Sequence, residues 1–353
     1  REMRNNMNKL IIPTGYMGSG SSAITDLICE FDGFDAENGT FEYVFMHCPD
    51  GLFDLEDKLI IGNNSMRSDE AIRSFEKRMY ELYNRKFWWV ANYKKKIGKE
   101  FWKITQDFID SLVQYKSDSY WYMQERLNLY RFIIMGFRAV LRVISGGRIN
   151  LNRPLEYKPM RISFLNEQQF YEKAGTYINN FLKCMGIEEK NIILDQLLLP
   201  HNIYRAEKYF DDRMECFVVN RDPRDVFILN KYIWPKVNET VPFPTEVNEF
   251  CGYYRGLRSI EKKGYNLHVH MIQFEELIYN YEYTLKKVMK ILKLDETMHS
   301  AKKQKFNPEK SINNTQLFIK DEYKAEASII ENNLSEFLYD FPYANDADVT
   351  QSF

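Results

Sequence analysis

Residues 10–24, LIIPTGYMGSGSSAI, join an apolar run to a second apolar stretch through a turn rich in glycine and serine. This pattern predicts a buried strand that leads through a tight loop into a helix. Glycines let the loop wrap closely around an anion, and the amide groups at the helix N-terminus then point at that anion. The spacing of Gly15 and Gly20 mimics a Walker A loop, but Ser21 stands where that motif requires lysine. We therefore predict an anion-binding loop poorly suited to ATP or GTP hydrolysis, with an ordinary strand-to-helix turn as the alternative.

Short runs rich in β-branched and aromatic residues alternate with helical periodicity along the rest of the chain. Strands are expected at residues 9–12, 41–45, 191–194, 216–219 and 267–273, and helices at 22–30, 167–185, 247–263 and 283–294. Strands separated by helices are typical of a parallel sheet covered by helices on both faces. We predict an α/β fold, a doubly wound parallel sheet of the P-loop type, formed by residues 1–66 and 149–353.

Residues 67–148 differ from the remainder in charge and composition. They hold 17 Lys/Arg and 9 Asp/Glu, a charge of +8, whereas the remainder has 31 against 41 and carries −10. Four of the five tryptophans also lie here: Trp88, Trp89, Trp102 and Trp121. We predict a helical insertion that acts as a lid or acceptor wall, although its aromatic residues also suit the core of a helical subdomain. Residues 130–144 combine arginines with apolar residues, so a third interpretation is an interfacial amphipathic surface that makes a peripheral membrane contact.

The overall composition limits the classes of function. With 353 residues and 44% hydrophobic content, the chain can form a sizeable core. A net charge of −2 argues against a nucleic-acid-binding protein. Five scattered cysteines without a CxxC motif indicate neither a disulfide framework nor a zinc site. Because no apolar run approaches the roughly 20 residues of a membrane helix, we expect a cytoplasmic protein, of bacterial origin.

A second candidate anion site follows the strand expected at 216–219. Residues 216–226, CFVVNRDPRDV, place two arginines and two aspartates at the carboxyl end of that strand, where open α/β sheets bind ligands. Arg221 is able to make a bidentate contact to phosphate. On its own this cluster suits a surface salt-bridge network. Paired with the glycine loop, which we expect at the far end of the same sheet, it predicts a second phosphate clamp.

The two anion sites together resemble those of the sulfotransferase family. The resemblance extends to Phe274-Glu275-Glu276-Leu277 and the helical segment 284–294, and it does not cover residues 67–148. It implies a sulfuryl-transfer enzyme that uses 3′-phosphoadenosine-5′-phosphosulfate (PAPS) and releases adenosine 3′,5′-bisphosphate (PAP), with no metal required.

The resemblance also implies which residues bind the nucleotide. The family's 5′-phosphosulfate loop aligns with the segment Gly18, Ser19, Gly20, Ser21 and Ser22, preceded by Gly15, and Gly18 replaces the family's lysine. The positive charge of that lysine then has to come from Arg224, Lys231 or an arginine of the insertion. Arg221 matches the arginine of the 3′-phosphate site, whereas Leu229 replaces the expected serine, so that Asn230 or Lys231 supplies the contact. Residues 310–315 are the nearest counterpart of the later nucleotide loop.

Three residues are candidates for the general base, since related branches of the family use histidine or glutamate. Glu42 follows the loop helix, where a glutamate-using carbohydrate branch places its base, and a carboxylate among apolar residues would have a raised pKa. His201 follows Leu199-Pro200 in a segment similar to that of the histidine-using branch, and histidine suits base catalysis at neutral pH. His47 is the third candidate. Glu42 is favoured over His201 and His47.

We accordingly predict a PAPS-dependent sulfotransferase that acts on a hydroxyl or amine of a carbohydrate or glycolipid. One alternative is a P-loop kinase-like phosphotransferase, which the missing lysine disfavours. Another is a degenerate nucleotide-binding scaffold whose basic helical region contacts a partner or a membrane.

Overall fold

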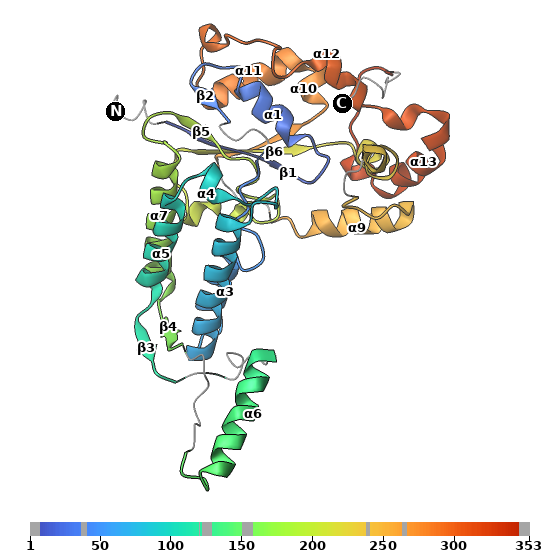
Figure 1. Cartoon of the computed structure of the whole chain (residues 1–353). Coiled ribbons are helices and arrows are strands. Elements are labelled where there is room, and N and C mark those ends of the chain that lie inside the picture. Colours follow the sequence, from blue (N-terminus) through green and yellow to red (C-terminus); the bar gives the residue numbers. More distant parts are fainter. Residues whose placement is uncertain are drawn as a thin grey trace.

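A five-stranded sheet forms the centre of the computed structural model, which describes residues 8–36, 41–119, 121, 129–149, 158–237, 241–262 and 267–345. All its strands run parallel, in the order β2-β5-β1-β6-β7. Their bounds are β1 Leu10–Gly15, β2 Phe34–Asp35, β5 Asn191–Ile193, β6 Met214–Asn220 and β7 Val269–Gln273. The predicted parallel α/β sheet is therefore confirmed (Figure 1).

Helices cover both faces of the sheet because successive strand residues point to opposite sides. On β1, Leu10 and Ile12 belong to one hydrophobic cluster and Ile11 to another. The cluster around Ile11 includes residues of three helices, α1 Ser21–Ile28, α10 Glu276–Tyr279 and α11 Tyr281–Leu292. The opposite cluster includes residues of α2 Leu52–Ile60, α3 Ser65–Asn84, α5 Glu100–Leu112 and α7 Glu167–Cys184. Figure 1 shows these two layers above and below the sheet.

The range 67–148 is mostly helical where the structure describes it, and part of it belongs to the main core. Phe75 of α3 and Phe101 and Phe108 of α5 lie in the same cluster as Leu10 and Ile12 of the sheet. These aromatic residues are thus core residues. A two-stranded antiparallel ribbon, β3 Tyr115–Ser117 with β4 Met160–Ile162, lies at the far end of α3 and α5. Within the predicted helical insertion, residues 120 and 122–128 lie outside the described residues.

The strand expected at 41–45 is absent, and this prediction is wrong. The Tyr43 amide donates to the carbonyl of Asp195 (2.9 Å), but from Val44 onward the chain curls into turns, with the amides of His47 and Cys48 bonded to the Val44 carbonyl. Phe41, Tyr43 and Phe45 are buried, which explains the apolar run. The sheet edge is instead formed by β2, which has two residues and is too short to leave a periodic pattern.

The remaining elements surround these layers. The α-helices are α4 Tyr93–Lys96, α6 Leu129–Ile144, α8 Pro223–Ile228, α9 Val247–Ser259, α12 Pro308–Ser311 and α13 Lys324–Asn333. The short 3₁₀ and π turns are η3 Ile203–Lys208, η4 Leu229–Ile233, η5 Trp234–Val237, η6 Glu296–Met298, η7 Ile312–Asn314, η8 Leu317–Ile319, η9 Asp321–Tyr323 and η10 Ser335–Phe337.

Candidate functional site

The glycine loop connects β1 to α1 at the carboxyl end of the sheet. Gly20 is the N-cap residue of α1, its φ is 83°, and no side chain caps the helix. The first amides of a helix have no intrahelical acceptor, so those at the start of α1 are available to an anion. The amide of Ser19 donates to the Tyr16 carbonyl (2.9 Å), which closes the loop into a turn. This geometry suits the predicted phosphate-binding loop.

At two positions of the loop, neighbouring aromatic rings leave room only for glycine. Gly18 has a φ of 81°, and a Cβ atom there would lie 2.8 Å from the Trp234 ring. At Gly20 a Cβ would lie 2.5 Å from the Phe274 ring. A lysine at position 18 would therefore need both a disfavoured backbone conformation and displacement of Trp234. At position 18, where the resemblance implies a lysine, the indole ring of Trp234 occupies the space that such a side chain would need.

Arg221 lies directly against this loop, since it follows β6, the neighbour of β1. Its Nη1 donates to the Gly18 carbonyl (3.0 Å) and its Nη2 donates to the Asn314 carbonyl. The guanidinium also lies over the Phe274 ring, 4.7 Å from its centroid. The structure thus brings together the loop, Arg221 and the segment 310–315, which the sequence had associated only by resemblance.

Ser19 Oγ and Arg221 Nε are buried at this point without a hydrogen-bond partner among the described residues. Both residues line a small cavity of about 10 Å³, together with residues of β6 and α9. A cavity of that size holds about one water molecule, so it must widen to admit a phosphate. Orphaned donors, free helix amides and a buried cation are nevertheless the groups that an anionic ligand satisfies.

A second cation at the loop was missed by sequence reasoning. Arg258 of α9 lines the same cavity, donates through Nη1 to Asn220 Oδ1 (2.7 Å) and pairs with Glu261 (3.2 Å). Its guanidinium lies 5.9 Å from the centroid of the Tyr16 ring. No motif marks Arg258, because its position depends on how α9 packs against the end of β6.

Buried carboxyl groups interact electrostatically with Arg221. Asp225 accepts the amides of Gln316 (2.9 Å) and Leu317 (2.8 Å), and Glu275 Oε1 accepts the amide of Asp222 (2.8 Å). Burial raises the pKa of Glu275 to about 8 and that of Asp225 to about 7. Near neutral pH these two groups are therefore partly protonated, which reduces repulsion of a bound anion.

The other predicted cations are bonded elsewhere. Arg224 forms two hydrogen bonds to Asp222 (3.0 and 2.7 Å), and its guanidinium lies over the Phe318 ring. Lys231 pairs with Glu326 at 2.5 Å. Among the contacts described, Arg221 is hydrogen-bonded to the glycine loop itself. Arg258 is hydrogen-bonded to Asn220, the last residue of β6, next to the loop.

Asn230, predicted to bind the nucleotide, is fully buried in η4. Its Nδ2 donates to the Phe243 carbonyl (3.0 Å), and its Oδ1 accepts the Phe243 amide (3.1 Å). These bonds hold the 243–244 backbone against η4. We therefore leave Asn230 out of the proposed nucleotide site.

On the other side of the loop, the end of β5 contacts α1 through Gln196. Gln196 Nε2 donates to Ser21 Oγ (3.2 Å), and its backbone amide donates to the Pro13 carbonyl (3.0 Å). Its φ of 57° is uncommon for a residue other than glycine, and such conformations gather at functional sites. Gln196 was not identified from the sequence.

A pair of carboxyl groups lies beside Gln196. Asp195 Oδ1 accepts a hydrogen bond from Thr25 Oγ1 of α1 (2.5 Å), which fixes Asp195 one turn from Ser21. Burial, with added repulsion from Asp195, raises the pKa of Glu42 to about 7. Burial likewise raises the pKa of Asp195 to about 7. A carboxyl group with a pKa near the working pH is well matched to general base catalysis.

The two histidines lie close enough to interact electrostatically. His47 Nε2 donates to the Gln196 carbonyl (2.8 Å), and burial lowers the pKa of His47 to about 4. Burial also lowers the pKa of His201, whose Nδ1 is buried without a partner among the described residues. All three predicted bases thus gather near the end of β5. Glu42 is the one whose pKa is shifted toward neutrality.

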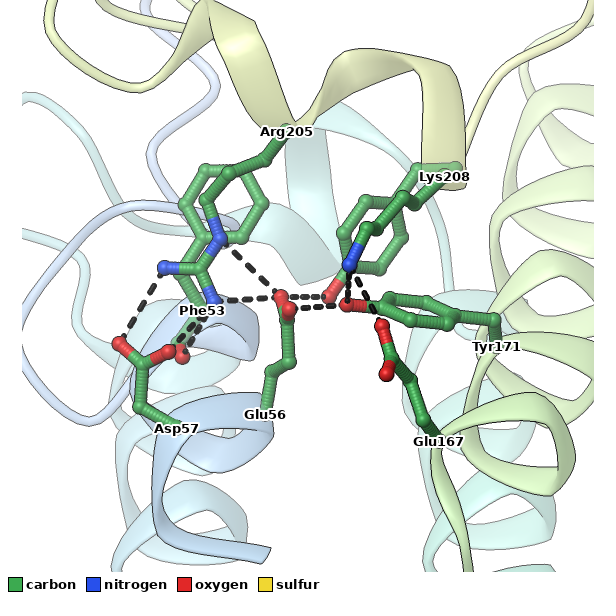
Figure 2. Close-up of polar contacts among 8 residues, drawn as sticks. Phe53, Glu56, Asp57, Glu167, Tyr171, Arg205 and Lys208 are labelled. Atoms are coloured by element: carbon green, nitrogen blue, oxygen red, sulfur yellow. Dashed lines mark hydrogen bonds and ion pairs between the residues drawn. The ribbon is translucent and has the colours of Figure 1, made fainter. Parts of the chain in front are cut away.

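A buried ionic network holds the segment that follows His201. Glu56 of α2 accepts hydrogen bonds from Arg205 (3.1 Å), from the Tyr209 hydroxyl (2.5 Å) and from the Tyr171 hydroxyl. Arg205 of η3 also pairs with Asp57 (2.8 Å), as Figure 2 shows. Because η3 begins two residues after His201, this network fixes the path of the chain at the edge of the candidate site.

We predict that Tyr209→Phe lowers the free energy of unfolding by about 1.5–3 kcal/mol, because a hydrogen bond to a buried charged carboxylate is lost. Tyr283→Phe on α11 is a matched control, since Tyr283 is exposed and should tolerate the change within about 0.5 kcal/mol. Urea unfolding of both variants measures the difference. Equal stabilities would show that Glu56 is satisfied without Tyr209.

Comparisons with known proteins give limited similarity. No family model matches the sequence, and no curated protein matches it significantly. A sulfotransferase of Mycobacterium tuberculosis aligns over 95% of this chain and 78% of its own, with 7% identity and a TM-score of 0.34. The sulfotransferase domain of the Synechococcus PCC 7002 olefin synthase aligns over 98% and 94%, with 12% identity and a TM-score of 0.35. A Mycobacterium avium sulfotransferase aligns over 99% and 73%, with 10% identity and a TM-score of 0.32. At these TM-scores the likeness assigns neither fold family nor activity.

Proposed function

We propose that this protein is a sulfotransferase that uses PAPS as its sulfuryl donor. The observation that carries the proposal is the contact between Arg221 and the glycine loop, where Ser19 Oγ and Arg221 Nε are buried without partners beside the uncapped N-terminus of α1. Two anion-binding groups at adjacent strand ends suit a nucleotide with phosphates at both the 5′ and 3′ positions.

The same geometry argues against the kinase-like alternative. A nucleoside triphosphate at a P-loop relies on a lysine to bind the β- and γ-phosphates. Ser21 stands at the position of that lysine, and its hydroxyl oxygen accepts a hydrogen bond from Gln196 Nε2 (3.2 Å). Bound PAPS would instead be held by the amides at the start of α1, the hydroxyls of Ser19, Ser21 and Ser22, and the charge of Arg221.

In the proposed reaction an acceptor oxygen or nitrogen attacks sulfur in line with the bridging oxygen. The bond from sulfur to that oxygen breaks as the new bond forms, and PAP carries away the negative charge. Glu42 takes the acceptor proton, while the loop amides and Arg221 stabilise the charge on the leaving phosphate. Asp195 is proposed as a positioning residue that helps set the pKa of Glu42. A carbohydrate or glycolipid acceptor is proposed from the resemblance in the placement of Glu42.

Calorimetric titration with PAP, ADP and ATP tests the nucleotide assignment. We expect PAP to bind more tightly than ADP or ATP, because only PAP carries a 3′-phosphate for the second clamp. Preference for ATP would support a phosphotransferase instead. Absence of binding by all three would support a degenerate scaffold.

Ser19→Ala is a precise probe of the same site. Because Ser19 Oγ has no partner among the described residues, its removal should leave the melting temperature unchanged. PAP affinity should fall by about 0.5–1.5 kcal/mol if the hydroxyl binds a phosphate oxygen. Ser259→Ala at the exposed end of α9 serves as the control. Unchanged PAP affinity in Ser19→Ala would remove this hydroxyl from the site.

A further inference from the structure

Helix α6 extends away from the body of the protein, as the green helix of Figure 1 shows. None of its residues belongs to the three hydrophobic clusters of the described structure. Large apolar side chains are exposed along its whole length: Leu129, Tyr130, Phe132, Ile133, Met135, Phe137, Val140, Val143 and Ile144, at 51–81%. A contiguous apolar surface of this kind marks an interaction site.

The residues of α6 are arranged as in a helix that lies along an interface. At about 100° per residue, Ile133, Phe137, Val140 and Ile144 share one face. Arg138 and Arg142, four residues apart, lie on the opposite face. This arrangement, a wide apolar face with a narrow basic face, is typical of helices that lie in the plane of a membrane surface.

The charge of α6 identifies the chemistry of its partner. The helix contains three arginines and no acidic residue, and the exposed Arg148 follows it. A second copy of α6 would offer apolar packing but no carboxylates for the exposed Arg142 and Arg148. An anionic bilayer offers both kinds of contact, because its acyl chains are apolar and its headgroups carry negative charge.

Arginines interrupt the apolar sequence of α6 at positions 131, 138 and 142. Across the described residues, the structure contains no helix with the length and apolarity to cross a membrane. The helix also ends by a local signal, because the amide of Gly147, at a φ of 83°, donates to the Arg142 carbonyl (2.8 Å).

We propose that α6 docks the protein on the surface of an anionic phospholipid bilayer. The apolar face of α6 enters the boundary between headgroups and acyl chains, and the exposed Arg142 and Arg148 contact lipid phosphates. This inference does not depend on the nucleotide site, since it uses none of the residues assigned there.

Co-sedimentation of the full chain with vesicles tests the proposal. Phosphatidylcholine vesicles are compared with vesicles that also contain phosphatidylglycerol, at low salt. We expect binding to the anionic vesicles to exceed binding to the neutral ones by at least about tenfold. Ile133→Gln/Phe137→Gln should lose binding to both kinds of vesicle, whereas Arg142→Gln/Arg148→Gln should lose the preference for anionic lipid.

Tyr283→Gln on α11 is the matched control, because Tyr283 is an equally exposed aromatic residue on another helix and should bind as the wild type does. Failure of the wild type to bind anionic vesicles would overturn the proposal, and so would binding that survives Ile133→Gln/Phe137→Gln. Sedimentation velocity without vesicles tests whether α6 instead binds a second copy of the chain. A concentration-dependent dimer that this double variant abolishes, without vesicle binding by the wild type, would assign the apolar face to a second copy.

Discussion

Glu42→Gln is expected to lower the rate of sulfuryl transfer about 10²–10⁴-fold, the contribution typical of a positioned general base. PAP affinity should be unchanged, because Glu42 lies on the β5 side of the loop and the nucleotide clamp involves β1 and β6. The measurement is turnover with a PAPS-coupled acceptor screen, beside PAP titration of the same variant. Glutamine keeps the shape of the side chain and removes its ability to accept a proton.

The pH dependence gives an independent test of the same role. Burial and Asp195 raise the pKa of Glu42 to about 7, and a base acts when deprotonated. Turnover should therefore rise with pH through about 7 and level off above it. Asp195→Asn keeps the hydrogen bond from Thr25 but removes the repulsion, so the pKa of Glu42 should fall and the rise should move to lower pH.

His201→Gln and His47→Gln distinguish the competing assignments. The His47 Nε2 proton is bonded to a backbone carbonyl, and burial lowers the pKa values of both histidines, so neither is favoured as the base. Turnover that survives Glu42→Gln but is lost in His201→Gln would transfer the role to His201.

Sequence reasoning located the strands whose signal is local. β1, β5, β6 and β7 each coincide with a predicted apolar run, and α1, α7, α9 and α11 with predicted helices. The run at 41–45 has the composition of a strand because its side chains are buried, yet its backbone turns at Val44. Over five residues, a buried turn and a buried strand have the same apolar pattern. Only the hydrogen bonds of the folded chain distinguish the two.

For the site, the sequence predicted the residues that follow strands and missed those brought in by packing. Gly18 and Arg221 follow the ends of β1 and β6. These strands are neighbours in the sheet, so the two anion sites, which we expected at far ends of the sheet, are in direct contact. Arg258 and Gln196 reach the loop from α9 and from the end of β5, and nothing in their local sequence marks them. The contact between the Trp234 ring and Gly18 could not be predicted from the sequence either, because it depends on how η5 packs against the loop.

Arg221→Ala is expected to lower the free energy of unfolding by about 3–5 kcal/mol, the usual cost of removing one partner from a buried charge cluster. Arg221 is 6% exposed, and its positive charge offsets Asp222, Asp225 and Glu275. Its loss would leave these carboxyl groups without that charge and the Gly18 and Asn314 carbonyls without their donor. Thermal and urea unfolding measure this loss without any assumption about function.

The loss of stability should also depend on pH. Asp225 and Glu275 have raised pKa values in the folded protein, about 7 and about 8, so folding binds protons and stability falls as pH rises from about 4 to about 8. Arg221 lowers both pKa values by its charge, so without it they rise further and the decline becomes steeper. Arg221→Ala should therefore cost more stability at pH 8 than at pH 6.

Arg213→Ala supplies the control from the opposite end of the same strand. Arg213 precedes β6 and pairs at 2.8 Å with Asp211, whose side chain is 55% exposed. An exposed pair of this kind contributes about 0–1 kcal/mol, with little dependence on pH in this range. Equal losses in the two variants, or a loss in Arg221→Ala that does not change between pH 6 and pH 8, would contradict the assignment of Arg221 as the buried counter-charge of this cluster. A large, pH-dependent loss confined to Arg221→Ala would establish that the charge at the loop is set by the fold before any nucleotide binds.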